Sequence, residues 1–323
     1  MTKGGYGFNI VSLEAKRRAW IRGCGPATIG EDLMLKIGII GAENSHCIRI
    51  ATICNVDKSI PCRVVSVWGE KLEYAQKAAS QCQIPEIVRD WRKMLGKVDG
   101  VMIDHRHAKF HAPVATFFVQ NGVPCFVDKP FTFTLAEGKK LCALARKKGV
   151  PITSFSVKVF QKSFKDFAKA AGKLGKIAMV NSSGPCDIRS QYGGISFYGI
   201  HQVDPMIEMF GNQVETAELR QCGDNGVATL TYKGGPIITI NCVKTGSQNF
   251  FCAVVGEKEV LGWPFGYDAN PYLAGAKIFT TMFRTGKEPI PHERMLAPVA
   301  VLEALDKSLK LGKPVKVASV KMK

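Results

Sequence analysis

Lys129 is the first residue of this sequence whose position could serve chemistry, because it follows an apolar run in the segment FVDKP (residues 126–130). If that run is a parallel strand, Asp128 and Lys129 lie at its carboxyl end, the edge of an open α/β sheet where ligands bind. The proline restricts the backbone and favours an extended conformation before it, so the ammonium would be presented rigidly. The alternative interpretation is a solvated loop lysine before a turn.

A second candidate is GAENSH (residues 41–46), which follows the first apolar run of the chain. A dinucleotide site requires GxGxxG or GxGxxA there, with glycines for a tight turn and for close approach of the pyrophosphate. Only Gly41 is kept, and the second position holds Glu43, which is bulky and negatively charged. A helix N-terminus would still favour an anion. The segment therefore neither establishes nor excludes nucleotide binding. Its candidate contacts to a nucleotide are Gly41, Asn44, Ser45 and His46.

Polar residues also follow the second and third apolar runs. Trp68 ends the second run, and Glu70 stands near the position where an acidic residue binds the adenosine ribose and selects NAD over NADP. Glu70 could equally be a charge at a helix N-terminus. After the third run, His105 and Arg106 are candidate cofactor contacts, because an arginine can pair with a phosphate or carboxylate. A loop is expected there, so its histidines would not share a face, and no metal site is predicted.

The last candidate is a glycine-rich lead, GGISFYG (residues 193–199), before a predicted helix that carries His201 and Asp204. A spacing of three residues puts both side chains on one helical face. The histidine could then act as a base and the carboxylate could orient it. A structural histidine–aspartate pair at a helix entry is the alternative.

Composition restricts the classes of protein to which this sequence can belong. Its 323 residues suffice for about two domains, and 46% apolar with 22% charged residues is typical of a globular protein. The 11 cysteines include no CxxC pair, which indicates reduced thiols in a cytoplasmic protein without zinc. No run approaches the roughly 18 apolar residues of a membrane span. The net charge of +17 is dispersed and accompanies no nucleic-acid motif, so we attribute it to solubility or to anionic cofactors and substrates.

The first half of the sequence alternates apolar runs with segments of helical spacing, which predicts a doubly wound parallel sheet. The predicted strands are 35–40, 62–68, 100–104, 124–128 and 150–154. The predicted helices are 45–55, 71–81, 110–121 and 135–148. Continuous apolar character is typical of parallel strands that are covered on both faces.

After about residue 155, strand-like runs separated by turn signals predominate, including the hairpin signal Lys233-Gly234-Gly235. The predicted strands are 177–182, 215–221, 227–232, 237–243, 250–255 and 259–261, and the predicted helices are 159–171 and 294–311. This pattern predicts a second, α+β domain with a large, mostly antiparallel open sheet.

Three segments are therefore expected. Residues 1–33 lack a secretory signal and are expected to be a disordered arm or a start-site extension. Residues 34–154 are expected to form a Rossmann-type NAD(P)-binding domain. Residues 155–323 are expected to form a domain for substrate binding and oligomerisation.

Two of these motifs resemble those of a known family. The segment VDKPFTFT (residues 127–134) resembles the EKP-type motif of the Gfo/Idh/MocA oxidoreductases, and GGISFYGIHQVDPMIEMFG (residues 193–211) resembles their motif GG…DxGxHxxD…G. The resemblance extends from about residue 36 to residue 317. It implies a Rossmann domain, an open-sheet C-terminal domain and NAD(P)-dependent oxidation or reduction of sugars and related polyols.

The resemblance also implies roles for particular residues. Lys129 would orient the reacting hydroxyl near the nicotinamide, His201 would move the proton, and Asp204 would contact the substrate. The catalytic aspartate of the family falls at Phe197, which cannot titrate. Tyr198 is adjacent and could serve as the acid if its pKa, normally near 10, were lowered.

The predicted function is hydride transfer between NAD or NADP, with NAD favoured, and a hydroxyl or carbonyl carbon of a sugar, inositol or sugar-derived substrate. Phe197 and Glu43 favour the alternative, a catalytically impaired relative that binds nucleotide or sugar as a sensor or accessory protein. A homo-oligomer is expected, with neither nucleic acid nor membrane as a partner.

Overall fold

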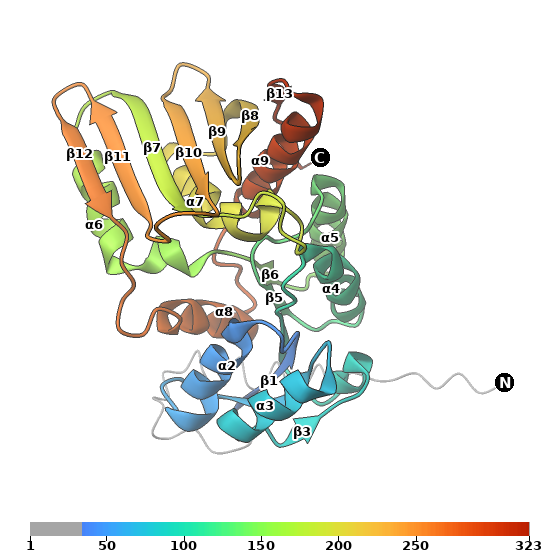
Figure 1. Ribbon diagram of the computed structural model, residues 1–323. Coiled ribbons are helices and arrows are strands. Elements are labelled where there is room, and N and C mark those ends of the chain that lie inside the picture. The colour runs from blue at the N-terminus through green and yellow to red at the C-terminus, as the bar shows by residue number, and fades with distance from the viewer. Residues whose placement is uncertain (1–33, 323) are drawn as a thin grey trace.

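Two β-sheets organise residues 34–322, the part of the chain that this computed structural model describes (Figure 1). The predicted arm at residues 1–33 lies outside the described residues. One sheet is built from the first half of the chain and the other from the second half, as the change in sequence pattern predicted. None of the described helices is long and apolar enough to cross a membrane.

The first sheet has six parallel strands in the order β3-β2-β1-β4-β5-β6. Their bounds are Leu35–Ile40 (β1), Cys62–Trp68 (β2), Glu86–Ile87 (β3), Gly100–Ile103 (β4), Cys125–Val127 (β5) and Ile152–Thr153 (β6). The strand order reverses between β1 and β4, and a doubly wound sheet binds its ligand in the crevice at that point. This confirms the predicted Rossmann-type sheet, with the two-residue β3 as an element that the sequence pattern had not indicated.

Helices connect these strands in the usual βα alternation. They are Ser45–Ala51 (α2, continued by one π-helical turn, η3, Thr52–Val56), Leu72–Cys82 (α3), Trp91–Met94 (η4), Ala108–Phe110 (η5), His111–Gln120 (α4) and Leu135–Lys148 (α5). Helix α5 has the predicted bounds because both its ends carry strong local signals. A capping box joins Thr134 to Glu137 at its start, and Gly149 adopts a left-handed conformation (φ 62°) at its end.

The second sheet has seven strands in the order β12-β11-β7-β10-β9-β8-β13. Their bounds are Ile177–Pro185 (β7), Val214–Cys222 (β8), Asn225–Tyr232 (β9), Ile237–Val243 (β10), Phe251–Gly256 (β11), Val260–Pro264 (β12) and Val315–Lys316 (β13). Only the pair β7–β10 is parallel, so the prediction of a mostly antiparallel sheet is confirmed. The predicted hairpin joins β9 to β10, with Gly234 at φ 63° in its turn.

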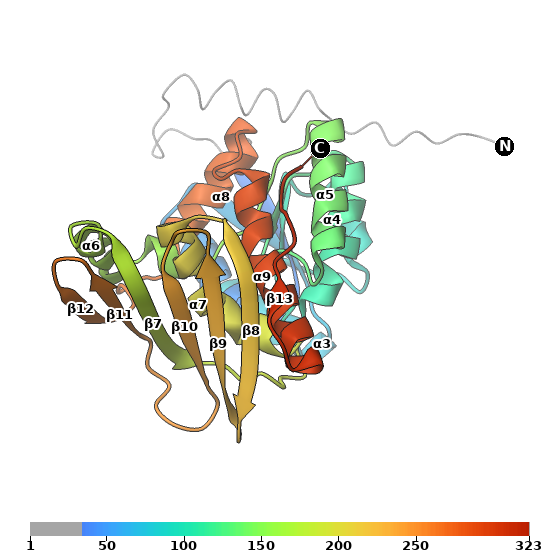
Figure 2. The same cartoon turned by 90° about the horizontal axis from the view of Figure 1, so that it is seen from above.

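Helices lie on one face of this second sheet, and the opposite face carries none of the described helices (Figure 2). The helices of this half of the chain are Val157–Phe160 (η6), Lys162–Ala171 (α6), Ile195–Phe210 (α7), Leu273–Thr285 (α8) and His292–Leu311 (α9). The inner face packs a continuous apolar core that includes Phe167, Met206, Ile238 and Leu305. Alternate residues of each strand therefore point to opposite environments.

Helix α8, which the sequence pattern did not indicate, packs against the first sheet although it belongs to the second half of the chain. Phe279 is fully buried and stacks on Phe126 of β5, with ring centroids 4.6 Å apart and an interplanar angle of 10°. A side chain at Gly100 of β4 would lie 2.5 Å from the ring of Phe283, so the glycine permits this close packing. One face of α9 joins the other core cluster of the first sheet through Met295 and other side chains. The expected domain boundary between residues 154 and 155 thus separates the two sheets. It does not separate their cores, because helices of the second half of the chain pack against the first sheet.

Substitution of Phe279 by alanine tests this packing. We expect the free energy of unfolding to fall by about 3–5 kcal/mol, because the change removes a fully buried aromatic ring and leaves a cavity. Leu311→Ala, at an exposed position at the end of α9, is the control and should change it by less than about 0.5 kcal/mol. Urea denaturation of both variants measures the difference. Equal effects would show that α8 does not contribute to the core.

Candidate active site

The carboxyl ends of β1, β4 and β5 meet at one edge of the first sheet, and the loop after β1 passes directly against the loop after β4. Gly41 has φ 113°, and a Cβ added there would lie 2.5 Å from the backbone of Asp104 and of His105. Only glycine allows this approach. Gly41 therefore has a structural requirement of the kind that the first glycine of a dinucleotide loop has.

Glu70 reaches from the end of β2 to this same loop. Its Oε2 accepts the backbone N–H of Glu43 at 3.0 Å, while its Oε1 is buried and has no hydrogen-bond partner. Burial raises the pKa of Glu70, and hydrogen bonds from the loop backbone act in the opposite direction. A buried acceptor without a donor is costly, and a ribose hydroxyl would supply that donor. Glu70 and the Gly41 turn thus fit the adenosine side of a dinucleotide.

The carboxylate of Glu43, which the sequence placed in the dinucleotide loop, has partners in other segments of the chain. It accepts a hydrogen bond from the Tyr192 hydroxyl at 2.7 Å and lies 4.0 Å from Arg106. The Arg106 guanidinium also stacks on the ring of Tyr192 at 4.2 Å and lies 5.1 Å from the ring of Phe197. Glu43 therefore ties the β1 loop to the second domain, and Phe197 fills an aromatic contact where a carboxylate was expected.

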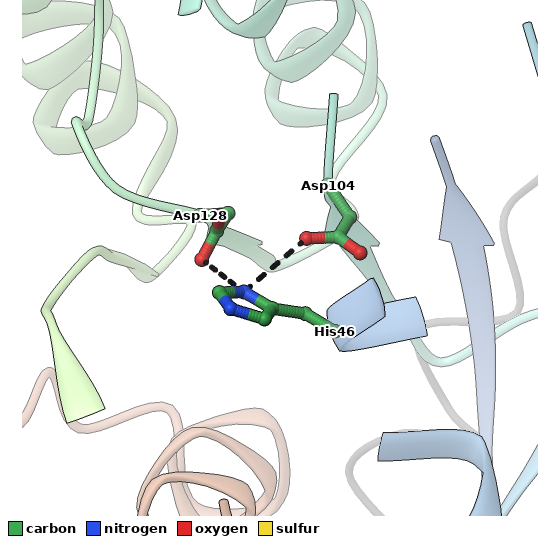
Figure 3. Close-up of side chains that lie close together, drawn as sticks. All are labelled: His46, Asp104 and Asp128. Atoms are coloured by element: carbon green, nitrogen blue, oxygen red, sulfur yellow. Dashed lines mark hydrogen bonds and ion pairs between the residues drawn. The ribbon is translucent and has the colours of Figure 1, made fainter. Parts of the chain in front are cut away.

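A cluster of polar side chains lies next to Lys129, and Figure 3 shows three of its members, His46, Asp104 and Asp128. His46 Nδ1 is 3.1 Å from Asp128 Oδ1 and 3.8 Å from Asp104 Oδ1. The amide of Asn44 donates to both carboxylates, at 3.0 Å to Asp104 and 3.2 Å to Asp128. The ammonium of Lys129 lies 3.4 Å from Asp128 Oδ2. The structure thus brings together four residues that the sequence suggested and one, Asp104, that it did not single out.

The two carboxyl groups of this cluster have pKa values shifted in opposite directions. Burial raises the pKa of Asp104 well above its usual range, and the neighbouring Asp128 raises it further. Burial also acts to raise the pKa of Asp128, but Lys129 and His46 outweigh it and hold that pKa below the usual range. Two like charges in a low-dielectric site cannot both be ionised cheaply. Asp128 is therefore the anion that pairs with Lys129, and Asp104 is the member of the pair that keeps its proton.

The same three side chains form the cluster of the described residues that could hold a metal ion. His46, Asp104 and Asp128 each offer one ligand atom within 4.8 Å of the others. Their mutual contacts, with the donors of Asn44 and Lys129, already satisfy Asp128. The cluster is therefore a hydrogen-bonded network in contact with Lys129, in which Asp104 Oδ2 is buried without a partner among the described residues.

His201 faces this edge from helix α7 of the second domain. Its Nδ1 lies 3.3 Å from the hydroxyl of Ser156, not against Asp204. Asp204 instead accepts the Ser156 backbone N–H at 3.2 Å and pairs with Arg294 at 2.6 Å. The predicted base and its orienting carboxylate are thus connected through Ser156, a residue that no sequence motif indicated.

Burial lowers the pKa of His201 well below its usual value, and Lys129 and Lys158 lower it further. The imidazole is therefore neutral near pH 7 and can accept a proton. Tyr198 lies beside it, with ring centroids 5.4 Å apart, and is 39% exposed. We call the region between Lys129 and His201 the chamber. Its His201 side therefore carries a neutral imidazole and a phenol.

The remaining predicted cofactor contacts have different surroundings. The His105 ring packs on Trp68 at 5.6 Å, and burial lowers its pKa to about 3, so it is neutral. Trp68 Nε1 donates to the Arg89 carbonyl at 3.3 Å. Ser45 is exposed and lines a separate cleft with Tyr272 and other residues, so the structure does not bring it to the Lys129 cluster.

Comparison with known proteins agrees with this architecture. Residues 35–156 match the GFO_IDH_MocA family, described as an oxidoreductase family with an NAD-binding Rossmann fold. The uncharacterized oxidoreductase YhhX of Escherichia coli (strain K12) is 36% identical over 115 residues, which cover 32% of this chain and 33% of that relative. The match thus spans about a third of that relative's length.

Solved structures resemble the chain over most of its length. Scyllo-inositol dehydrogenase of Lactobacillus casei, with bound NAD(H) and scyllo-inositol, has 15% identity and a TM-score of 0.77, covering 88% of this chain and 100% of that one. GenD2 from gentamicin A biosynthesis, in complex with NAD, has 15% identity and a TM-score of 0.77, covering 88% and 97%. At this identity the likeness establishes the fold.

A Rossmann domain joined to an open-sheet domain, with a polar site between them, defines a class of two-domain dinucleotide-binding proteins. Within that class, the first domain, over residues 35–156, matches the NAD-binding Rossmann fold of the Gfo/Idh/MocA oxidoreductases, the family whose motifs the sequence resembles.

The paired carboxyl groups predict opposite effects of two conservative substitutions. Because the pKa of Asp104 is raised in the folded state, the folded state binds its proton more tightly and loses relative stability as pH rises above about 4. Asp104→Asn should therefore stabilise the protein increasingly from pH 5 to pH 8. Asp128→Asn should destabilise the protein, and the whole loss of unfolding free energy should already be present at pH 5. The reason is that a carboxyl group with a lowered pKa stabilises the folded state at every pH above its pKa in the unfolded chain.

Urea unfolding of both variants at pH 5 and pH 8, each against wild type, measures these differences. A stabilisation by Asp104→Asn that does not grow with pH would contradict the assignment of the proton to Asp104.

Proposed function

We propose that the protein is an NAD(P)-dependent oxidoreductase that transfers hydride between the nicotinamide and a hydroxyl or carbonyl carbon of a sugar, inositol or sugar-derived substrate. The observation that carries the proposal is that Lys129 of the first domain and His201 of the second lie close enough for the charge of one to shift the pKa of the other. Lys129 is 8% exposed at the edge of the Rossmann sheet, and its charge lowers the pKa of His201 in the other domain. The L. casei relative that binds NAD(H) and scyllo-inositol supports this class of substrate.

Each of the two residues would have a distinct role. The ammonium of Lys129, fixed by Asp128, would donate a hydrogen bond to the substrate oxygen and stabilise negative charge on it. The neutral imidazole of His201 would accept the hydroxyl proton during oxidation and return it during reduction. The bound nicotinamide supplies the hydride acceptor or donor. Tyr198, beside His201, could contact the substrate at the open side of the chamber.

Asp204 would act as a positioning residue. Both its oxygens contact protein donors, one on Arg294 and one on the Ser156 backbone, and Ser156 in turn contacts His201. Its influence on the histidine would therefore be indirect. Phe197 stands where the family has a catalytic aspartate. In its place, this chain of contacts would orient His201, and burial would keep the imidazole neutral.

For the cofactor, the residues present favour NAD over NADP. Glu70 would accept a hydrogen bond from an adenosine ribose hydroxyl through its unpartnered Oε1. Its negative charge would repel a 2′-phosphate. The Gly41 turn, Asn44 and His46 would line the path toward Lys129.

The alternative function, a sensor or accessory protein that binds nucleotide or sugar without efficient hydride transfer, is favoured by one observation. Phe197 stacks with Arg106 and Tyr192 in place of the titrating residue that the family motif has. Binding without turnover would distinguish it from the oxidoreductase.

Titration with NADH and NADPH, followed by nicotinamide fluorescence, tests the cofactor. We expect NADH to bind more tightly, by 10-fold or more, because Glu70 opposes the 2′-phosphate. No binding of either cofactor at high micromolar concentration would contradict the proposal.

Turnover with a panel of inositols, sugars and sugar acids tests the chemistry. Lys129→Ala should lower kcat/KM by about 100-fold or more, because it removes charge stabilisation at the reacting oxygen. Lys140→Ala, an exposed lysine on α5, is the matched control and should leave kcat/KM unchanged. Activity that survives Lys129→Ala would remove this lysine from the mechanism.

We further propose that the open face of the second sheet pairs with a second copy of the chain. Four exposed apolar side chains lie in register across its strands: Ile237, Met179, Val255 and Val260. Such a contiguous apolar row is typical of an interface.

Met179→Glu should reduce the oligomer to smaller species, because it places a charge in the middle of that row, and light scattering after gel filtration measures the mass. Val56→Glu, an exposed apolar position of the first domain, is the control and should keep the wild-type mass. A monomeric wild type would contradict the pairing.

A further inference from the structure

Lys158 of η6 is a buried lysine that no role described above uses. Its side chain is 3% exposed, and its ammonium lies over two aromatic rings, 3.4 Å from the centroid of Phe250 and 4.2 Å from that of Tyr267. Phe250 precedes β11 and Tyr267 precedes α8, so two distant segments of the chain enclose one amine. Cation–π contacts of this kind hold an ammonium in place without neutralising its charge.

Among the described residues, no carboxylate pairs with Lys158. The carboxylates that could do so have other partners: Asp204 binds Arg294, Asp187 lies 3.4 Å from Lys244, and Asp128 lies 3.4 Å from Lys129. Burial lowers the pKa of Lys158 to about 7. The protein thus holds a lysine in an apolar place and supplies no counter-charge, which is costly unless a ligand provides one.

Lys158 belongs to the same chamber as His201. Its backbone N–H donates to the Ser156 hydroxyl, the group that contacts His201 Nδ1. The ring of Phe250 lies 6.3 Å from that of His201, and the charge of Lys158 contributes to the lowered pKa of His201.

The aromatic wall of Lys158 also borders an open cavity. Phe250 and Tyr267 line it together with Phe197 and Tyr198, and its volume is about 450 Å³. A cavity of this size is in the range of small-molecule sites. Phe250 of this lining contacts both the Lys158 ammonium and the His201 ring, so the cavity lies next to both groups.

We propose that Lys158 forms a carboxylate-binding subsite, so that the substrate of this chamber is a sugar acid, an aldonate or a uronate, and not a neutral polyol. The inference rests on the proposed function for the reacting centre and adds the class of substrate. A substrate carboxylate would supply the counter-charge that the chain omits, in a charge-assisted hydrogen bond. A neutral polyol would leave the ammonium without a partner.

Binding of an acid should then depend on pH. Above about pH 7 the free amine loses its proton, and an acid must restore that proton when it binds, so its affinity falls as pH rises. The other titratable or charged groups around the chamber are His201 and Tyr198 of α7, Tyr267 and Asp268 before α8, and the paired Lys129 and Asp128. The lowered pKa of His201 and the raised pKa of Tyr267 keep both groups neutral near pH 7.

Calorimetric titration of the full chain with NAD present tests the subsite. The probes are two matched pairs, D-gluconate with D-glucitol and D-glucuronate with D-glucose, which differ by a carboxylate in place of a hydroxymethyl group. At pH 6 we expect at least one acid to bind about 10- to 100-fold more tightly than its neutral partner. Lys158→Met should abolish that preference, whereas the exposed control Lys165→Met should retain it.

Between pH 7 and pH 8.5 the preference should decline in wild type and persist in Lys158→Arg, whose charge does not titrate. Equal binding of acid and neutral probe in both pairs, no binding of any probe, or a preference that survives Lys158→Met would each overturn the subsite. A kcat for neutral polyols that rises with pH through 7 and is lost in Lys158→Arg would instead make Lys158 a proton acceptor, and would also overturn it.

These outcomes are separable from the proposed function. An acid preference without hydride transfer keeps the subsite and rejects the oxidoreductase. Turnover of neutral polyols that Lys158→Met leaves unchanged keeps the oxidoreductase and rejects the subsite.

Discussion

Two buried carboxyl groups share one edge of a parallel sheet, and the rest of the site depends on how their charges are arranged. Asp104 and Asp128 both accept hydrogen bonds from the side-chain amide of Asn44, so their carboxyl groups lie close together. Two buried negative charges at so short a distance cannot both form cheaply. Asp128 carries the charge because Lys129 and His46 lie against it, and Asp104 keeps its proton because it is fully buried. This arrangement holds Lys129 in place. It also requires the strand order that puts β4 between β1 and β5.

The opposite wall is built on a second chain of polar contacts, which runs from Arg294 through Asp204 and Ser156 to His201. Its members come from α9 (Arg294), from α7 (Asp204 and His201) and from the segment after β6 (Ser156). Because α8 and α9 pack against the core of the first sheet, the two walls are joined by apolar contacts as well as by the hydrogen bond between Tyr192 and Glu43. The chamber is therefore a product of both domains. Within residues 34–322, the Lys158 ammonium of this chamber has aromatic neighbours and no carboxylate partner.

Much of the fold could be predicted because local signals and burial agreed. The parallel strands β1 and β2 are short, continuous apolar runs, and α5 has a capping box and a terminal glycine, so their observed and predicted bounds coincide. Helix α8 was missed because its apolar face is defined by contact with a sheet far away in the sequence. In the site, Lys129 and His201 were indicated by motifs, whereas Asp104, Ser156 and Lys158 have no motif. Their importance comes from burial and from neighbours that the sequence does not bring together.

The sequence by itself determined the class of fold and the family that the first domain matches, and it predicted Lys129 and His201 as site residues, since strand periodicity and short motifs are local properties. Only the tertiary structure decided where charge resides. It turned Glu43 away toward Tyr192, paired Asp204 with Arg294 and not with His201, and left Lys158 without a carboxylate among the described residues. The physical reason is that the pKa and the partners of a buried group depend on the local dielectric and on charges brought close by folding. Spacing along the chain does not contain that information.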